Sequence, residues 1–428
     1  MSRATSPRPA SPPDSESTTA GPSPPDQPQE VDATTLLDIN RGNRPSRASL
    51  VSAFVVPVLV IGQAAWATYV VCYQLAHQRL MKRDKQMGAG YAVIVLQALF
   101  IFMAGVTYMR LIQVIYTDPG LLPLGMSRAK PEDGGNDDMK AVMKRWSEKR
   151  SIIQHTTPED ARTREELFKE LAAHNQRQAE LRMEALKSFR PKDMFIVAPD
   201  GLPRWCKTCE TFKPDRTHHC SDLGRCVRRM DHFCPWVGGI VSETTTKFFV
   251  QFLFYAMLLC IFMLATTITL FKRDNDRYGQ RNPQLIALLV LSGVYTLFTV
   301  GMFQNSMWML AKNFTTIEQR QFGMPLHLAV RISPDWYAGN VDHLSCYMVV
   351  SFASAPGEKW AIFQTDPRAK LWDLGGAYAN VCQVLGKRVW EWVLPVTYSP
   401  CAKPADDVSE YPFGPAALAV TQNVQAPK

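Results

Sequence analysis

The chain has 428 residues, of which 46% are hydrophobic, and a formal net charge of +8. Its apolar residues are gathered into long runs, which excludes a single soluble globular domain and indicates a membrane protein. The excess of positive charge is small for this length, and no basic groove interleaved with aromatic residues is visible. We therefore expect no nucleic-acid partner.

Residues 1–48 are rich in Pro and Ser and poor in apolar residues. Such a segment buries too little surface to offset the entropy lost on ordering, so we predict a disordered N-terminal tail. The first apolar run is too long and too internal for a cleaved leader. We expect it to act as a signal anchor.

Four apolar runs each reach the length of about 20 residues that a helix needs to cross a hydrocarbon core. They lie near Val51–Ala76, Tyr91–Tyr116, Phe248–Phe271 and Gln284–Leu310. The predicted fold is an integral membrane α-helical protein with four transmembrane helices, paired at 49–116 and 248–310. A Cys-rich zinc-binding domain at 201–247 separates the second helix from the third.

Five of the ten cysteines fall between Cys206 and Cys234. This clustering favours a metal or catalytic site over a disulfide framework, and it predicts a reducing compartment. Lys and Arg flank the runs on both sides, so charge bias gives no orientation. The free thiols decide the orientation instead, so we expect both termini and the Cys-rich domain on the cytosolic side. The sequence does not specify which membrane holds the protein.

Two polar regions flank these elements. The linker at 117–200 opens with the turn sequence Asp118-Pro119-Gly120 and contains a charged helix near 158–188, either a solvated arm or a partner-binding coiled coil. The C-terminal region at 311–428 contains a Trp-rich block, residues 371–395, expected to pack on the Cys-rich segment or to lie in the membrane interface. Residues from about Ala402 are predicted to be disordered.

A predicted zinc site begins with Cys206 and Cys209, which are separated by two residues. His219 and Cys226 follow at distances that let four ligands surround one Zn²⁺. His218 is a competing ligand that the sequence does not exclude.

A second constellation is Asp231, His232 and Cys234, followed by Pro235 and Trp236. The imidazole can take the thiol proton and the carboxylate can orient the imidazole, which would activate the thiol as a nucleophile. The residue types alone leave two roles open for Cys234, a nucleophile or a further metal ligand.

Several motifs in order resemble the DHHC family of protein S-acyltransferases (palmitoyltransferases). They are Asp118-Pro119-Gly120, the segment Cys206 to Phe249 with Lys213-Pro214-x-Arg216-x-x-His219-Cys220 and Asp231-His232-x-Cys234-Pro235-Trp236, Thr315-Thr316-x-Glu318, and the block from Asp373-Leu374-Gly375 to Asn380 and Gly386. The resemblance extends over most of the chain.

The resemblance implies a ping-pong reaction in which Cys234 accepts a fatty acyl group, such as palmitoyl, from acyl-CoA and passes it to protein cysteines near the membrane. His232 would be the general base and Asp231 its orienting carboxylate. Trp236 would face the acyl chain in a cavity among the helices, and structural support would come from Thr315, Thr316, Glu318 and Asn380. Nearby basic residues would meet CoA phosphates or remain solvated: Arg225, Arg228, Arg229 and Lys247.

The chain departs from the family at a second zinc site. Its expected ligands fall at Cys220, Leu223, Phe233 and Ile240, so three of the four are large apolar residues. We expect one zinc ion, and a hydrophobic cluster of Leu223, Phe233 and Ile240 in place of the second, with Cys220 a buried thiol or an alternative ligand.

Four neighbouring positions also differ from the family: Gly238-Gly239 stands where it has two Asn, and Ser242 and Thr245 where it has Gly and Asn. These glycines would permit a sharper bend or loosen the site. The leading hypothesis is an active S-acyltransferase. The alternative is a catalytically weak membrane scaffold that retains the fold and binds partners.

Overall fold

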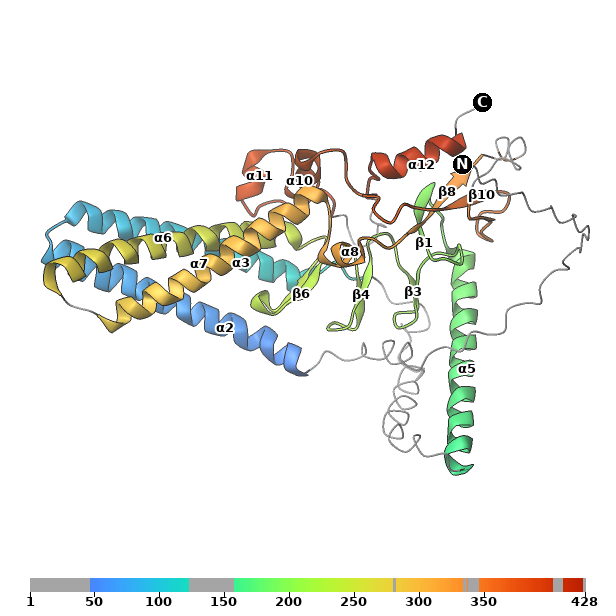
Figure 1. Cartoon of the computed structure of the whole chain (residues 1–428), viewed down its shortest axis with the longest axis horizontal. Helices are drawn as coiled ribbons and strands as arrows, with labels where there is room; N and C mark the ends of the chain where they lie inside the picture. Colours follow the sequence, from blue (N-terminus) through green and yellow to red (C-terminus); the bar gives the residue numbers. More distant parts are fainter. Residues whose placement is uncertain are drawn as a thin grey trace, which may run out of the picture. The chain divides into compact units, whose positions relative to one another are not determined.

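The computed structural model describes residues 47–122, 158–279, 282–333, 337, 346–402 and 411–425. The tail predicted to be disordered falls outside this range apart from residues 47 and 48, which begin a helix. Figure 1 gives the order of the elements along the chain.

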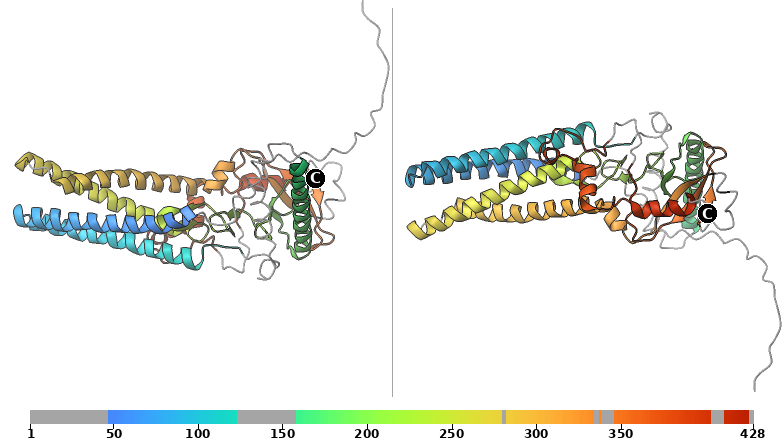
Figure 2. Two further views of the ribbon diagram at one scale, coloured as in Figure 1. Left: turned by 90° about the horizontal axis from the view of Figure 1, so that it is seen from below. Right: turned by 90° about the horizontal axis from the view of Figure 1, so that it is seen from above.

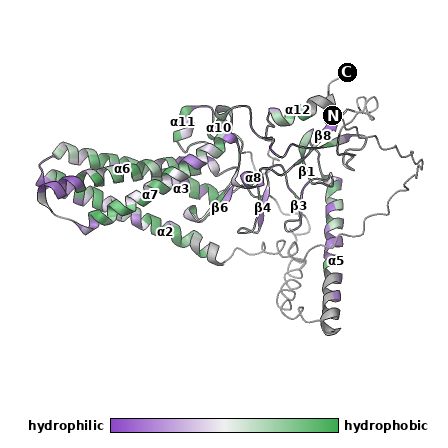
Figure 3. Ribbon diagram, in the orientation of Figure 1, coloured by the Kyte–Doolittle hydropathy of each residue, from purple (hydrophilic) through white to green (hydrophobic). Residues whose placement is uncertain are grey.

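Four long helices form a bundle (Figure 2). They are α2 (Arg47–Tyr69) continued by the π-helix η1 (Val70–Arg83), α3 (Met87–Thr117), α6 (Thr246–Tyr278) and α7 (Pro283–Lys312). Each is long and apolar enough to cross a membrane, with hydrophobic residues along its length (Figure 3). The predicted fold class, four membrane helices with a Cys-rich domain between the second and third, is confirmed.

Large apolar side chains are exposed on the outside of this bundle, among them Phe54, Phe102 and Leu297. Such exposure suits a lipid environment, where apolar surface has no cost. Ionic contacts join the helices at the end remote from the Cys-rich domain. Asp274 pairs there with Arg79 and Arg83, and Arg273 pairs with Asp84.

Three small hairpins make up the Cys-rich domain. They pair β2 (Trp205–Cys206) with β3 (Thr211–Phe212), β4 (His218–Cys220) with β5 (Arg225–Val227), and β6 (His232–Cys234) with β7 (Gly239–Val241). The end of α3 is tied to this domain because the Leu122 amide donates to the Cys226 carbonyl and Leu121 bridges to Val227.

A four-stranded antiparallel sheet was not predicted from the sequence. Its order is β1 (Met194–Val197), β8 (His327–Ile332), β10 (Lys359–Gln364) and β9 (Met348–Val350). Strand β1 precedes helices α6 and α7 in the chain, whereas the other three strands follow them. No local sequence pattern therefore predicts their pairing. Alternate residues bury both faces: Phe195 and Trp360 belong to one apolar cluster, and Ile196 and Leu328 to another.

Helix α5 (Pro158–Ser188) ends against the first of these faces, where Leu186 is buried. Its Gln178 accepts a hydrogen bond from the Trp205 indole at 3.2 Å, so this half of the helix lies on the Cys-rich domain. The choice between a solvated arm and a coiled coil did not foresee this packing.

The second face is covered by the C-terminal segment, including Tyr411 and α12 (Pro415–Gln425). The prediction of disorder beyond Ala402 was therefore wrong for residues 411–425. Tyr411 and Ala417 are buried against residues that are distant in the sequence.

Three further short α-helices are α8 (Thr316–Gln321), α10 (Ala377–Leu385) and α11 (Val389–Val393), and a 3-10 turn, η2 (Pro235–Val237), follows β6. Helix α11 lies on α6, where Gln251 donates to the Glu391 and Leu394 carbonyls and Tyr255 to that of Val393. Val389 remains 78% exposed. The Trp-rich block thus packs on a membrane helix and presents apolar residues outward.

Candidate active site

The three residues of the predicted nucleophile constellation lie together at the start of hairpin β6–β7. The His232 Nδ1 donates to the Asp231 Oδ2 at 2.5 Å, and the Cys234 thiol lies close enough to the ring to raise the pKa of His232. Cys234 is 3% exposed and is not part of the metal-type Cys/His cluster found among the described residues. Its position therefore fits the nucleophile alternative rather than that of a ligand.

Helix α8 holds the carboxylate of Asp231 through its first residue. The Thr316 amide donates to Oδ1 at 2.6 Å, and the Thr316 hydroxyl donates to Oδ2 at 3.1 Å. Amides at a helix N-terminus stabilise a negative charge. Asp231 is thereby fixed as an ionised acceptor facing His232.

Burial and hydrogen bonding oppose one another in this pair. Burial raises the pKa of Asp231, but the hydrogen bonds from His232 and Thr316 outweigh it and the net pKa is lowered. Burial lowers the pKa of His232, but its bonds to Asp231 and Cys234 raise it to about 9. The site thus stabilises a protonated imidazole beside the Cys234 sulfur.

A buried ion pair positions α8. Arg216 donates from Nε and Nη2 to the two carboxylate oxygens of Glu318, both at 2.7 Å, and the side chains are 0% and 13% exposed. Glu318 also closes a capping box with Thr315 at the start of α8. No role was predicted for Arg216, although its place in the Lys213-Pro214-x-Arg216 motif was a usable signal.

Asn313 and Asn380 join the end of α7 to the C-terminal region. Asn313 accepts from Arg216 at 2.9 Å and donates to the Trp372 carbonyl at 2.6 Å. Asn380 donates to the Ala311 carbonyl and to Asp373, both at 2.9 Å. Asn380 thus supports the helix that precedes α8, and among the described residues it makes no hydrogen bond to Asp231, His232 or Cys234.

An apolar cavity of about 610 Å³ opens from Cys234 into the helix bundle. All four long helices line it, through residues such as Pro57, Tyr108, Phe252 and Phe298. Trp236 also lines it, with its ring centroid 4.9 Å from that of Phe298. The volume and lining suit a ligand with a long hydrocarbon portion.

The glycine pair after Trp236 permits close contact between the hairpin and two membrane helices. Gly238 has φ +67, and a Cβ there would lie 2.6 Å from the Ala53 carbonyl oxygen of α2. A Cβ on Gly239 would overlap the Ile115 side chain of α3. The glycines do not leave the turn loose, because α2 and α3 pack directly against it.

Hydroxyl groups fasten the turn between β7 and α6. Ser242 donates to the Pro119 carbonyl at 2.9 Å and Thr244 to that of Asp118 at 2.6 Å. Thr245 accepts from the Ser242 amide and donates to the Ile240 carbonyl. These bonds connect the active-site hairpin to the Asp118-Pro119-Gly120 turn.

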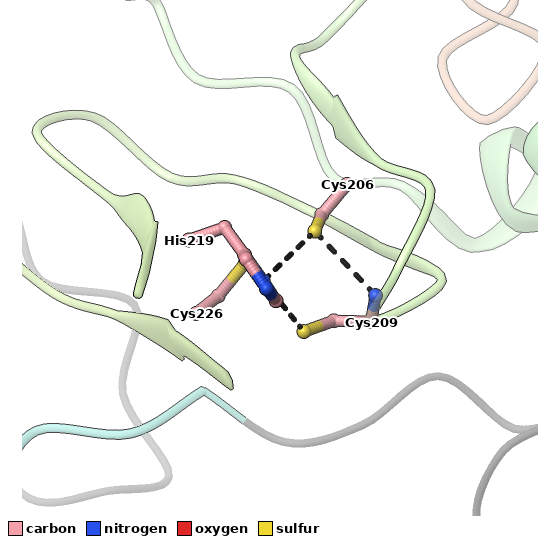
Figure 4. Close-up of side chains that lie close together, drawn as sticks. All are labelled: Cys206, Cys209, His219 and Cys226. Atoms are coloured by element: carbon pink, nitrogen blue, oxygen red, sulfur yellow. Dashed lines mark hydrogen bonds between the residues drawn. The ribbon is translucent and has the colours of Figure 1, made fainter. Parts of the chain in front are cut away.

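The residues predicted to bind zinc lie together in the first two hairpins (Figure 4). The His219 Nδ1 lies 3.5, 3.4 and 3.9 Å from the Sγ atoms of Cys206, Cys209 and Cys226. Tetrahedral Zn²⁺ with its usual bond lengths separates sulfur from nitrogen by about 3.5 Å, so the donor set fits the metal. His218 lies outside the group, since consecutive residues of β4 face opposite sides.

The region of the missing second site holds a hydrophobic cluster, but its members differ from the prediction. Ile240 pairs with Phe233 across β6 and β7, and both lie with buried Cys220 and Val227. Leu223 is 36% exposed, so its predicted membership was wrong. Residues outside the ligand positions join instead, namely Leu121 and Met230. Burial raises the pKa of the Cys220 thiol, consistent with an uncoordinated neutral group.

The basic residues considered for CoA phosphates are largely internal. Arg228 and Arg229 are 2% exposed, and Lys247 is fully buried with its ammonium on the Thr397 hydroxyl. Arg225 donates to the Leu122 carbonyl. The expectation that these residues bind phosphates or stay solvated was wrong for the three buried ones.

Fold and site together define a four-helix membrane protein that carries an Asp–His–Cys group and a Cys/His cluster able to hold a metal ion. Residues 200–322 match the family model described as DHHC palmitoyltransferase. Palmitoyltransferase pfa5 of Aspergillus fumigatus is 32% identical over 400 residues, covering 86% of this chain and 89% of that protein. Palmitoyltransferase pfa5 of Emericella nidulans is 30% identical, covering 87% and 86%. Palmitoyltransferase ZDHHC15 of Xenopus laevis is 33% identical over 148 residues, covering 34% and 44%. The chain belongs to the DHHC palmitoyltransferase family.

Replacing Arg216 by Ala should destabilise the protein by about 3–5 kcal/mol, because it leaves Glu318 buried without a partner. Arg216→Lys should recover only part of this loss, since one ammonium cannot make both bonds. Thermal unfolding in detergent measures the effect. The matched control is Arg331→Ala, which removes exposed ion pairs with Asp193 and Glu358 and should cost at most about 1 kcal/mol. Equal losses for Arg216→Ala and Arg331→Ala would contradict the assignment.

Replacing Asp231 by Asn should lower the pKa of His232 from about 9 toward its ordinary value of about 6.5. The imidazolium is lost as pH rises through that pKa, so its inflection should move to lower pH. The measurement is the rate at which a small maleimide alkylates Cys234, followed by peptide mass spectrometry across pH. An unchanged inflection would show that Asp231 does not act on His232.

Proposed function

We propose that the protein transfers a long-chain fatty acyl group from acyl-CoA to cysteine thiols of membrane-associated proteins through a thioester on Cys234. The observation that carries this proposal is the position of Cys234. Its thiol meets a hydrogen-bonded Asp231–His232 pair on one side and an apolar cavity among four membrane helices on the other. Palmitoyl is the expected acyl group, given the relatives named above.

The reaction requires two transfers at the same sulfur. His232 accepts the thiol proton, and the Cys234 sulfur attacks the acyl carbonyl and displaces CoA thiolate, which takes the proton back from His232. In the second half, His232 accepts the proton of a substrate cysteine. That sulfur attacks the thioester carbonyl, and Cys234 leaves and recovers the proton.

The neighbours of these groups suit this sequence. Asp231 stabilises the imidazolium in both halves, while Thr316 keeps the carboxylate ionised and oriented. Trp236 and the cavity would hold the hydrocarbon chain, and Thr315, Glu318 and Asn380 would position the elements around the site. The hydrogen bond between His232 and Asp231 supports this acid–base role.

Zinc would be held by Cys206, Cys209, His219 and Cys226, where it would link hairpin β2–β3 to hairpin β4–β5 as a structural ion. Its thiolate ligands require a reducing environment. We therefore place the catalytic domain and both termini in the cytosol, where acyl-CoA and protein cysteines would reach the membrane face.

Purified full-length protein incubated with labelled palmitoyl-CoA should acquire label that hydroxylamine removes. Cys234→Ala should abolish this label, and His232→Ala should reduce it by roughly 100-fold or more, the usual worth of a general base. The control is Cys346→Ala, a half-buried thiol remote from the cavity lining, which should label normally. Absence of label on the parent, or label that survives Cys234→Ala, would favour the scaffold alternative.

Metal analysis of the purified protein should find about one zinc ion per chain, since one complete ligand set is found in the described residues. Cys209→Ser should lower both zinc content and thermal stability, because metal binding is coupled to folding. Cys220→Ser should leave the zinc content unchanged. Two ions per chain would refute the replacement of the second site by an apolar cluster.

A further inference from the structure

The C-terminal segment at 411–414 fits closely against the loop after β10. Phe413 stacks on Trp372 with ring centroids 4.5 Å apart and an interplanar angle of 23°. The Gly414 amide donates to the Leu371 carbonyl at 2.7 Å, and a Cβ on Gly414 would overlap the Asp373 backbone. This fit places Tyr411 at a defined point inside the protein, although sequence reasoning had assigned it to a disordered tail.

Tyr411 is 6% exposed and contacts two charged residues from different parts of the fold. Its hydroxyl donates to the Glu243 carboxylate, in the turn between β7 and α6. Its ring lies 5.3 Å from the Arg216 guanidinium carbon, and the Trp372 ring lies 5.2 Å from the same carbon. The guanidinium therefore has two aromatic neighbours as well as its carboxylate partner.

Successive contacts connect Tyr411 with the reacting groups through Arg216 and helix α8. Arg216 binds Glu318, which caps the start of α8. Thr316 of the same helix holds Asp231, the partner of His232. On the other side, Glu243 follows β7, the strand paired with β6. Tyr411 thus contacts Arg216, which anchors α8 through Glu318, and Glu243, which follows the hairpin that carries His232 and Cys234.

We propose that Tyr411 is a positioning residue for acyl transfer. It holds α8 and the β6–β7 hairpin in register, so that Thr316, Asp231 and His232 remain aligned beside Cys234. This inference rests on the proposed roles of His232 and Cys234. It adds a residue from the C-terminal segment that contacts neither the cavity lining nor the nucleophile.

Removal of the Tyr411 side chain should change the chemistry of His232 and not only the amount of folded protein. The titratable groups facing His232 are Asp231 and Cys234, with Phe249 of α6 against its ring. Those around Tyr411 are Glu243, Cys401, Arg229 and Arg216. When α8 shifts, Asp231 loses its alignment, so the His232 inflection in Cys234 alkylation should move below pH 9.

The experiment compares Tyr411→Leu, Tyr411→Phe and the control Tyr347→Leu in the full-length protein. Tyr347 is 55% exposed and directly precedes β9, an edge strand of the four-stranded sheet. Each variant is assayed for thermal unfolding, zinc content, the pH profile of Cys234 alkylation and the rate of labelling by palmitoyl-CoA.

Tyr411→Leu should slow labelling roughly tenfold and move the inflection about one unit toward lower pH, because it loses both the ring and the hydroxyl contacts. The apparent KM for palmitoyl-CoA should stay within about twofold, since Tyr411 does not line the cavity. Tyr411→Phe keeps the ring, so its rate should fall only about two- to fivefold. Tyr347→Leu should match the parent.

A parent-like inflection in Tyr411→Leu would overturn the proposal, and so would a rate loss that only follows the fraction of folded protein. If the Leu variant fails to fold, Tyr411→Phe decides: a rate and profile identical to the parent would overturn it. Alkylation does not depend on acyl-CoA. A parent that fails to label therefore refutes the proposed function, while the alkylation profile still tests Tyr411.

Discussion

The bidentate ion pair between Arg216 and Glu318 is the contact on which the active-site geometry depends. Its partners are 102 residues apart, with two membrane helices between them. A six-residue helix such as α8 is not stable alone, so its place is set by what it contacts. Because both charged groups are largely buried, removing either partner would leave the other charge unpaired and destabilise the folded protein. This anchorage brings Thr316 onto Asp231, and Asp231 in turn orients His232.

The proposed nucleophile lies between an apolar and a polar part of the protein. Cys234 packs with apolar residues of α3 and α6, including Leu111 and Phe249, while Asp231 and His232 extend to the polar domain. An acyl-CoA has the same division between a hydrocarbon chain and a charged head. The thiol thus lies where the carbonyl between these two halves would arrive.

At the positions that depart from the family motif, apolar packing and hydroxyl hydrogen bonds replace the metal ligands and side-chain amides of the family. Phe233 and Ile240 pack with Cys220 in place of a second metal site. Gly238 and Gly239 let α2 and α3 approach the hairpin directly. Ser242 and its neighbouring threonines bind the Asp118-Pro119-Gly120 turn. The nucleophile set is unchanged throughout.

The sequence by itself determined the four spans, the Cys206–Cys226 ligand set and the order of Asp231, His232 and Cys234, because each depends on local composition or short spacing. Only the tertiary structure decided the four-stranded sheet, the role of Arg216, the exposure of Leu223 and the burial of Tyr411. These depend on pairing between segments separated by the membrane helices. No local pattern records which distant surface a side chain will meet, since burial is a property of the assembled fold.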